Sequence, residues 1–272
     1  MHLERILSRT RQDLEERKRT QSRAELESLA AAHIPRGFAA ALRARAEHGP
    51  AIIAELKKAS PSKGLIRADF DVATLAPLLA KAGAAALSVL TEEHFFQGSL
   101  RNLELASELT AVPCLRKDFI VDEFQILEAR AHGADAILLI VAALSDTELR
   151  RLTDSAHQWQ LDVLCEVHTA EELDRVSSLG CDAYGVNNRN LTTFEVSLET
   201  SLALADGLPA EAVRVAESGI HTVDDLRLLR GAGFHAFLIG ESLMRESSPG
   251  ESLGLLLSAF ADPQLAIPGK RG

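Results

Sequence analysis

Two lysines and three glutamates stand at the ends of short apolar segments, where their side chains could transfer protons. These residues are Glu55, Lys57, Lys117, Glu166 and Glu217. In a shared site, carboxylates keep lysines protonated and lysines keep carboxylates ionised, which is the equipment of general acid–base catalysis. We therefore predict that Lys117 donates a proton and that Glu166 is an acid–base group, whereas Glu55 and Glu217 position the lysines. For Glu55 and Lys57 the alternative is an ion pair that only fixes the core.

Further polar residues follow the same apolar segments and could bind an anionic or polar ligand. Asn187 is a neutral hydrogen-bonding group, and Arg189 could either bind a carboxylate or phosphate or brace a loop. Small residues that could turn backbone N–H groups toward a phosphate occur in Ser218-Gly219-Ile220 and Gly240-Glu241-Ser242. We expect Glu241 to contribute its backbone N–H while its side chain turns outward.

Two other segments could shape a ligand pocket. Residues 60–64, with the sequence SPSKG, are too polar to be buried. They are expected to form either a lid in which Ser60 contacts the ligand or a helix-capping loop. Phe119 and Leu138, with Phe95 and Phe96, could form an apolar wall for an aromatic ligand, although packing in the core is the commoner fate of such residues.

Eight apolar segments alternate with helix-like segments and must position these side chains. The predicted strands are 52–56, 86–90, 112–115, 136–141, 163–165, 183–186, 213–216 and 236–239. Strands that are apolar on both faces are typical of a parallel sheet covered by helices. We therefore predict an α/β protein with a single (β/α)8 TIM barrel, in which strand ends converge on one mouth. An open doubly wound sheet is the alternative, but no GxGxxG motif follows the first strand.

The glycines before alternate strands support this repeat. Gly83, Gly133, Gly180 and Gly233 each follow a helix-like segment and lie about 50 residues apart, twice the length of one strand–helix unit. Glycine suits the left-handed conformation that ends many helices. We predict that each of these four residues ends a helix and leads into an apolar strand.

The predicted organisation places a helical extension before the barrel. Residues 1–50 show helical periodicity and are expected to pack on the barrel, with a separate interaction arm as the alternative. Residues 51–262 form the predicted barrel, and 263–272 a poorly ordered C-terminal tail.

Composition excludes several classes of function. A net charge of −10 argues against nonspecific nucleic-acid binding. The three cysteines lack metal-type spacing and are expected to be reduced thiols, and the histidines form no ligand motif, so no metal is expected. Residues 1–30 lack an apolar signal region and no apolar run is long enough to span a membrane, so we predict a cytoplasmic protein without membrane contact.

The chain resembles the indole-3-glycerol phosphate synthase family in five segments that occur in family order and span nearly the whole chain. They are residues 55–64, 115–120, 185–191, 215–220 and 238–244. The resemblance implies ring closure of 1-(o-carboxyphenylamino)-1-deoxyribulose 5-phosphate with loss of CO2 and water, in tryptophan biosynthesis. It also implies that neither a metal nor an organic cofactor takes part.

The resemblance also implies roles for individual residues. Lys117 would be the general acid that protonates the carbonyl oxygen, and Glu166 would act in dehydration. Lys57, oriented by Glu55, would bind anionic groups and share in proton transfer. The catalytic residues implied are Lys117, Glu166, Lys57, Glu55, Asn187 and Ser218. The substrate-binding residues implied are Ser60, Phe119, Leu138, Arg189, Glu217, Gly219, Gly240 and Glu241. The family often has serine where Glu241 stands, so a backbone contact is expected there.

The expected partner is a small phosphorylated substrate. Other tryptophan-pathway enzymes are candidate partners, and a monomer or weak homo-oligomer is expected. Two other functions fit the same residues: another phosphosugar-handling barrel enzyme, such as an isomerase, and a non-catalytic phosphate-binding scaffold. An isomerase would form no indole and release no CO2, and a scaffold would have no use for Lys117 and Glu166 together.

Overall fold

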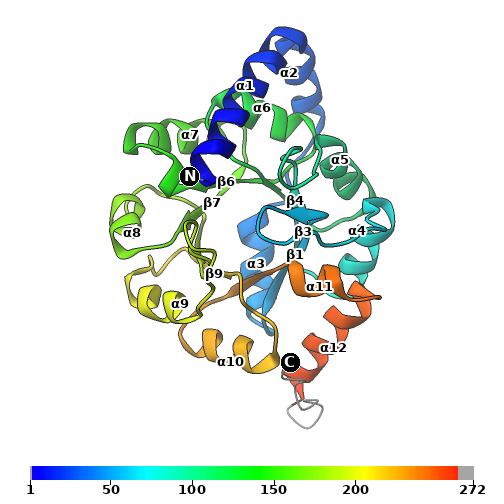
Figure 1. The fold of residues 1–272 in the computed structure, drawn as a ribbon, viewed down its shortest axis with the longest axis vertical. Helices are drawn as coiled ribbons and strands as arrows, with labels where there is room; N and C mark the ends of the chain where they lie inside the picture. The colour runs from blue at the N-terminus through cyan, green and yellow to red at the C-terminus, as the bar shows by residue number, and fades with distance from the viewer. Residues whose placement is uncertain (1, 263–272) are drawn as a thin grey trace.

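The computed structural model describes residues 2–262 and contains a closed barrel of eight parallel strands (Figure 1). The barrel strands are β1 (Ala51–Leu56), β4 (Ala86–Leu90), β5 (Cys114–Lys117), β6 (Ala136–Ile140), β7 (Asp162–Val167), β8 (Ala183–Asn187), β9 (Val213–Glu217) and β10 (Ala236–Ile239). Strand β1 closes the ring by pairing with both β4 and β10. The predicted (β/α)8 barrel is confirmed, and the predicted tail, 263–272, lies outside the described residues.

Helices follow the strands and cover the outside of the barrel (Figure 1). They are α4 (Val72–Lys81), α5 (Leu100–Leu109), α6 (Glu123–Ala131), α7 (Asp146–Gln158), α8 (Ala170–Val176), α9 (Glu199–Leu204), α10 (Val223–Gly231), α11 (Glu241–Arg245) and α12 (Pro249–Ala261). The shorter elements are the 3-10 helices η1 (Val141–Ala143) and η2 (Ala205–Gly207), and the hairpin strands β2 (Ala59–Ser60) and β3 (Gly64–Leu65).

Side-chain caps begin most of the helices that follow a barrel strand. The capping residues are Asp71, Ser99, Asp122, Ser145, Thr169 and Thr222. Each accepts a hydrogen bond from a backbone N–H of the first helical turn, which has no partner within the helix. Because these caps end the strand-to-helix loops, they hold the loops that carry the polar side chains.

Glycines turn the chain at the other end of the barrel. Gly83, Gly133, Gly180 and Gly233 have φ angles of 105°, 83°, 79° and 93°. A side chain is strained in this region, whereas glycine adopts it at little cost. Three of the four glycines directly follow the C-cap of a helix, as predicted, whereas Gly180 lies four residues beyond the end of α8 at Val176.

The barrel interior is closed at its N-terminal end by α3 (Phe38–Ala46), which lies behind the strands in Figure 1. Phe38 and Leu42 are fully buried. They pack against the inward-facing residues Ile53, Leu115, Leu164, Val215 and Leu238. In the described part of the chain, this end of the barrel is therefore filled by side chains, which leaves the C-terminal mouth as the end that can admit a ligand.

The other two N-terminal helices, α1 (His2–Thr20) and α2 (Arg23–Ala32), pack on the outside of the barrel near α6 (Figure 1). Leu14 and Leu26 join the core between strands and helices. Arg17 of α1 lies 2.8 Å from the carboxylate of Glu128 in α6. These contacts direct the beginning of α1 to the mouth of the barrel.

The cysteines Cys114, Cys165 and Cys181 are buried and free, as the sequence predicted. Within residues 2–262, no group of three or more His, Cys, Asp or Glu side chains is placed to hold a metal ion. No helix in the same range has both the length and the apolar character to cross a membrane.

A buried carboxylate joins the N-terminal extension to the barrel. Asp135, which is fully buried before β6, accepts hydrogen bonds from the backbone N–H groups of Arg36 (2.7 Å) and Cys114 (2.6 Å). The Arg36 guanidinium lies 2.5 Å from the same carboxylate. Burial acts to raise the pKa of Asp135, but the hydrogen bonds from His33 and Arg36 and the Arg36 charge outweigh burial and lower it.

We predict that Asp135→Asn lowers the free energy of unfolding by about 3 kcal/mol at pH 7, because Arg36 loses its charged partner. The folded pKa of Asp135 is depressed, so its contribution is present above the unfolded pKa of about 4 and is lost as pH falls through the folded pKa. Urea unfolding at pH 7 and at decreasing pH measures both effects. Asp224→Asn, at an exposed ion pair, should leave the unfolding midpoint unchanged. A stability difference that does not vary with pH would contradict the assignment.

Candidate active site

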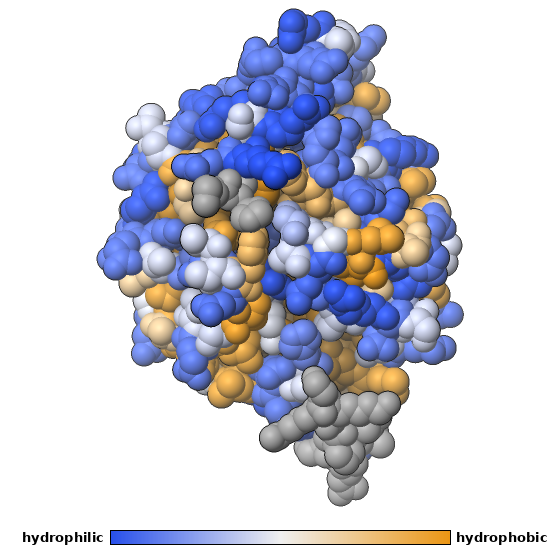
Figure 2. Space-filling view, viewed as in Figure 1, coloured by the Kyte–Doolittle hydropathy of each residue, from blue (hydrophilic) through white to orange (hydrophobic). Residues whose placement is uncertain are grey.

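The residues proposed from the strand ends meet at the C-terminal mouth of the barrel, in two adjoining cavities. The first is lined by Glu55, Lys57, Ser60, Lys117, Phe119, Leu138, Glu166, Asn187, Arg189, Ser218 and Glu241, among others. The second shares both lysines with the first and adds Glu217, Gly219 and Gly240. All of the catalytic and substrate-binding residues that the family resemblance implies are therefore brought together. Figure 2 shows hydrophilic residues over α1 and α2 at the top of this face and apolar residues near its middle.

Lys117 lies at the centre of a cluster of buried ion pairs. Its Nζ atom lies 2.6 Å from Oε2 of Glu217 and 3.4 Å from Oε2 of Glu166. Nζ of Lys57 lies 2.5 Å from Oε2 of Glu55. The three carboxylate side chains are at most 6% exposed, whereas the side chains of Lys57 and Lys117 are 16% and 13% exposed. The carboxylates thus hold the ammonium groups in place while both lysines face the ligand space.

The pKa values in this cluster follow from burial and charge. Burial acts to lower the pKa of Lys117, but the charges of Glu217, Glu166 and Glu55 outweigh burial and raise it. Burial acts to raise the pKa of Glu55, but the charges of Lys57 and Lys117 lower it below its usual range. Burial raises the pKa of Glu217 to about 7, with Lys117 opposing the shift and Glu166 adding to it. Lys117 is therefore protonated at neutral pH.

The charges of the cluster favour the binding of one additional proton. Two ammonium groups face three carboxylates, so one negative charge is uncompensated when all five groups are ionised. An uncompensated buried charge is costly, and such a group takes up a proton instead. Glu217, with its pKa raised to about 7, is suited to holding this proton.

Two glycines supply the space in which the carboxylates lie. A Cβ atom added to Gly185 in β8 would collide with Oε1 of Glu217. A Cβ atom added to Gly240, directly after β10, would collide with the side chain of Glu55. A larger residue at either position would displace a carboxylate from its lysine.

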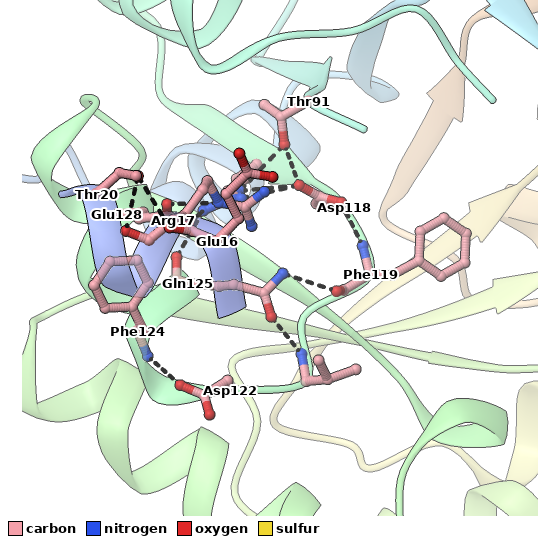
Figure 3. Close-up of polar contacts among 12 residues, drawn as sticks. Glu16, Arg17, Thr20, Thr91, Asp118, Phe119, Asp122, Phe124, Gln125 and Glu128 are labelled. Atoms are coloured by element: carbon pink, nitrogen blue, oxygen red, sulfur yellow. Dashed lines mark hydrogen bonds and ion pairs between the residues drawn. The ribbon is translucent and has the colours of Figure 1, made fainter. Parts of the chain in front are cut away.

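The chain around Lys117 is held from outside the barrel. The neighbouring Arg116 is 1% exposed and contacts the carboxylates of Asp118 (2.9 Å) and Glu128 (3.4 Å). Asp118 also accepts the backbone N–H of Phe119 at 2.8 Å, as Figure 3 shows. These bonds fix the backbone on both sides of the lysine, so that Lys117 and Phe119 keep their positions in the cavity.

Apolar side chains form one wall of the first cavity. Phe119 packs near Phe96, with ring centroids 6.1 Å apart, and Leu138 lies on the same cavity. Phe95 does not line this cavity, and the Arg5 guanidinium lies 5.3 Å from the centre of its ring. The predicted apolar wall therefore includes three of the four proposed residues, with Phe95 excluded.

Helix α1 contributes to the same wall, which sequence reasoning did not anticipate. Leu3 and Ile6 from its first turns line the first cavity. Both follow ordinary helical periodicity, so nothing in their spacing separates a ligand-facing side chain from a core side chain. Only the packing of α1 against the barrel brings them to the mouth.

The turns after β9 and β10 form the end of the site suited to an anion. Ser218 and Gly219 both adopt positive φ angles, 66° and 77°, which turn the chain sharply at the end of β9. Gly240 lies on the same cavity, as does Lys63 from the hairpin after β1. Backbone N–H groups at such turns and a nearby ammonium group can bind a phosphate.

Glu241 differs from the expectation that its side chain turns away. Its carboxylate lies 3.0 Å from a guanidinium nitrogen of Arg245 and 3.6 Å from one of Arg189, and it lines both cavities. The reason is that these two arginines attract the carboxylate toward the mouth. Arg189 also donates to the carbonyl of Phe194 (3.5 Å), so it braces the loop after β8 and also faces the ligand space.

The segment after β1 forms a hairpin and is more buried than expected. Strands β2 and β3 pair as an antiparallel hairpin, and Ser60 is only 9% exposed while lining the first cavity. The carbonyl of Lys58 accepts the backbone N–H groups of Ile66 (2.9 Å) and Arg67 (3.2 Å). Because the backbone groups at the base of the hairpin are hydrogen-bonded, burying Ser60 leaves few polar groups without partners. The tip of the hairpin at Lys63 remains exposed to solvent.

His168 lies beside Glu166 and was not among the residues predicted from the sequence. Its Nε2 atom lies 3.4 Å from Oε1 of Glu166. Burial acts to raise the pKa of Glu166, but Lys117, then His168, and a hydrogen bond from Asn187 lower it. Residues two apart in an extended segment share a face, so the spacing of Glu166 and His168 was a signal that could have identified the histidine.

Comparisons with known proteins agree with this geometry. The family model for indole-3-glycerol phosphate synthase matches residues 3–254. Proteins of that name are similar to this chain. One from Koribacter versatilis is 61% identical over 94% of this chain and 98% of its own length. One from Acidithiobacillus ferrooxidans is 49% identical over 92% of this chain and 96% of its own length. A crystal structure of KGPDC from Streptococcus mutans, 13% identical, has a TM-score of 0.60 over 78% of this chain and 96% of its own, which shows a shared fold.

We predict that Gly185→Ala lowers turnover by about 10- to 100-fold while the protein remains folded, because the new methyl group displaces Glu217 from Lys117. Steady-state kinetics and circular dichroism measure the two effects. Gly231→Ala is the matched control, since a methyl group there meets open space. Equal activity of the two variants would show that the position of Glu217 is not important.

Proposed function

This chain belongs to the indole-3-glycerol phosphate synthase family, and we propose that Lys117 and Glu166 divide the proton transfers of its reaction. The enzyme is a carboxy-lyase of tryptophan biosynthesis. It converts 1-(o-carboxyphenylamino)-1-deoxyribulose 5-phosphate into indole-3-glycerol phosphate, CO2 and water. The observation that carries the proposal is the position of Lys117 Nζ between Glu217 and Glu166, on the cavity that Phe119 also lines.

The two ends of the site define the orientation of the substrate. Its carboxyphenyl ring lies against Phe119 and Leu138, since an aromatic ring is best accommodated by the apolar wall. Its phosphate lies at the turns of Gly219 and Gly240, where backbone N–H groups and cations can face it. This orientation places the ketone carbon between the two ends, near Lys117.

Ring closure requires a proton at the ketone oxygen. The aromatic carbon that carries the carboxylate attacks the ketone carbon, and the electrons of the C=O bond move to oxygen, which takes a proton from Lys117. The carboxylate then leaves as CO2, and the electrons of its bond restore the aromatic ring. The three carboxylates around the lysines keep Lys117 charged until this step and stabilise its charge during binding.

Dehydration requires a group that both accepts and donates a proton. The hydroxyl group formed by ring closure leaves as water after it gains a proton, and the neighbouring ring carbon loses one. Glu166 takes up the proton that the ring loses and supplies the one that the hydroxyl needs. Its lowered pKa leaves it ionised at neutral pH and so ready to accept first.

The remaining polar residues hold the substrate in this position. Lys57, oriented by Glu55 at 2.5 Å, binds an anionic group and shares in proton transfer. Asn187 and Arg189 bind polar groups of the substrate. Ser60 and Ser218 contact it from the hairpin and from the end of β9, and Glu217 fixes Lys117. Glu241 contributes its backbone N–H at the phosphate end.

We also propose that the enzyme is cytoplasmic and is a monomer or weak homo-oligomer that binds neither nucleic acid nor membranes. The net charge of −10 supports the absence of nucleic-acid binding, because an acidic surface repels the phosphate backbone. Other tryptophan-pathway enzymes are the candidate protein partners. Sedimentation of the purified chain, alone and mixed with those enzymes, tests the oligomeric state and these contacts.

We predict that Lys117→Ala lowers turnover at least about 100-fold, the usual effect of removing a general acid. Lys117→Arg keeps the positive charge but does not release its proton, so it should lose similar activity even where the alanine variant is unstable. Indole fluorescence and CO2 release measure turnover, and Lys81→Ala, on the outer surface of α4, is the control. Near-normal turnover of the arginine variant would remove Lys117 from the mechanism.

We predict that Glu166→Gln slows dehydration more than ring closure, because glutamine cannot exchange protons. CO2 should then appear before indole fluorescence, and mass spectrometry should detect an intermediate that is heavier than the product by one water molecule. Simultaneous appearance of CO2 and indole in this variant would contradict the role of Glu166.

A further inference from the structure

Each turnover of the reaction consumes one proton, which must be supplied to the active site again before the next turnover. A negatively charged carboxylate leaves the substrate as neutral CO2, so each turnover consumes one proton in addition to those exchanged during dehydration. Under the proposed function this proton comes from Lys117, because the ketone oxygen keeps it until it departs in water. Lys117 must therefore be reprotonated before the next cycle.

Lys117 has little direct access to water. Its side chain is 13% exposed, and that exposed part faces the cavity in which the substrate lies. Its contacts Glu217 and Glu166 are 1% and 3% exposed. A proton therefore reaches Lys117 most directly through a neighbouring titratable group that extends beyond the substrate cavity.

His168 is such a group. Its side chain is 10% exposed, and its two ring nitrogens face different carboxylates: Nε2 lies 3.4 Å from Oε1 of Glu166, and Nδ1 lies 3.2 Å from Oε2 of Glu172. The same oxygen of Glu172 accepts the backbone N–H of His168 at 2.7 Å. Glu172 therefore fixes the imidazole so that its other nitrogen faces Glu166.

The imidazole leads to a separate groove. His168 and Glu172 line this groove together with Thr169 of the α8 cap, Asn187 and Arg189. His168 does not line the substrate cavity, although Asn187 and Arg189 line both spaces. The imidazole thus lies between the groove and the buried side of Glu166.

We propose that His168, oriented by Glu172, carries the proton consumed in each turnover from this groove to Glu166, which passes it to Lys117. The imidazolium gives its Nε2 proton to Oε1 of Glu166, the carboxyl group rotates, and Glu166 then gives that same proton to the neutral amine of Lys117. The imidazole ring then rotates so that its deprotonated nitrogen reaches the groove and regains a proton from water there. The inference depends on the proposed roles of Lys117 and Glu166, and it makes His168 a relay residue that does not touch the substrate.

The charges around His168 favour its protonated form. The groups that face it are Glu166 of β7, Glu172 of α8 and Glu217 of β9, with Glu4 of α1 and Arg189 on the groove and Lys117 beyond Glu166. Burial acts to lower the pKa of His168, but the hydrogen bond to Glu172 and the charges of Glu166, Glu172 and Glu217 outweigh burial and raise it.

The relay can be tested in His168→Gln by following indole fluorescence over the first and later turnovers. The first turnover should proceed at the wild-type rate, because Lys117 is already protonated, and later turnovers should be at least about tenfold slower with KM unchanged. Added imidazole should restore the later turnovers, since it can enter the groove and replace the missing ring. His157→Gln, at an exposed ion pair between α7 and Asp182 directly before β8, is the matched control.

The outcomes separate the relay from the underlying mechanism. Equal rates in His168→Gln and the control would overturn the relay, as would a loss that affects the first turnover equally and does not respond to imidazole, because either result indicates a structural role. The variants Lys117→Arg and Glu166→Gln are measured in the same assay. If they lose activity while His168→Gln does not, the relay alone is wrong; if they remain active, the proposed function fails first.

Discussion

The ion pair between Lys117 and Glu217, joined by Glu166, is the interaction on which the rest of the site depends. Burying charges costs several kcal/mol per ion, and the attraction between them compensates only when the geometry is good. Three different strands must therefore position these side chains so that Nζ of Lys117 lies 2.6 Å from the carboxylate of Glu217 and 3.4 Å from that of Glu166. A closed barrel meets this requirement because the register of each strand is fixed by two neighbours.

Several features that look unrelated serve this cluster. Gly185 and Gly240 leave the space that the carboxylates of Glu217 and Glu55 fill. Arg116, on the outer face of β5, anchors the chain next to Lys117 through Asp118 and Glu128. Charges outside the barrel thus hold the backbone, and charges inside it are free to face the substrate. The buried ion pairs of Arg116 with Asp118 and Glu128 thus support the active site from outside the barrel.

The N-terminal helices act at both ends of the barrel. Phe38 of α3 fills the closed end, while Leu3 and Ile6 of α1 extend the apolar wall at the open end. Arg17 connects α1 to Glu128, which also contacts Arg116 beside Lys117. The extension therefore contributes to the pocket and is linked by ion pairs to the strand that carries the proposed general acid.

Much of the fold and site could be predicted from the sequence because both are encoded locally. Apolar runs alternating with helical periodicity indicate a parallel barrel, and the last residues of parallel strands converge at one edge, which identified Lys117, Glu166 and Glu217. Tertiary packing decided the rest: the burial of Ser60, the ion pairs of Glu241, the arrival of Leu3 at the mouth and the position of His168 between two carboxylates. Local periodicity determines which way a side chain points within its own element, but the partner it meets belongs to an element distant in the chain, and only the folded structure brings the two together.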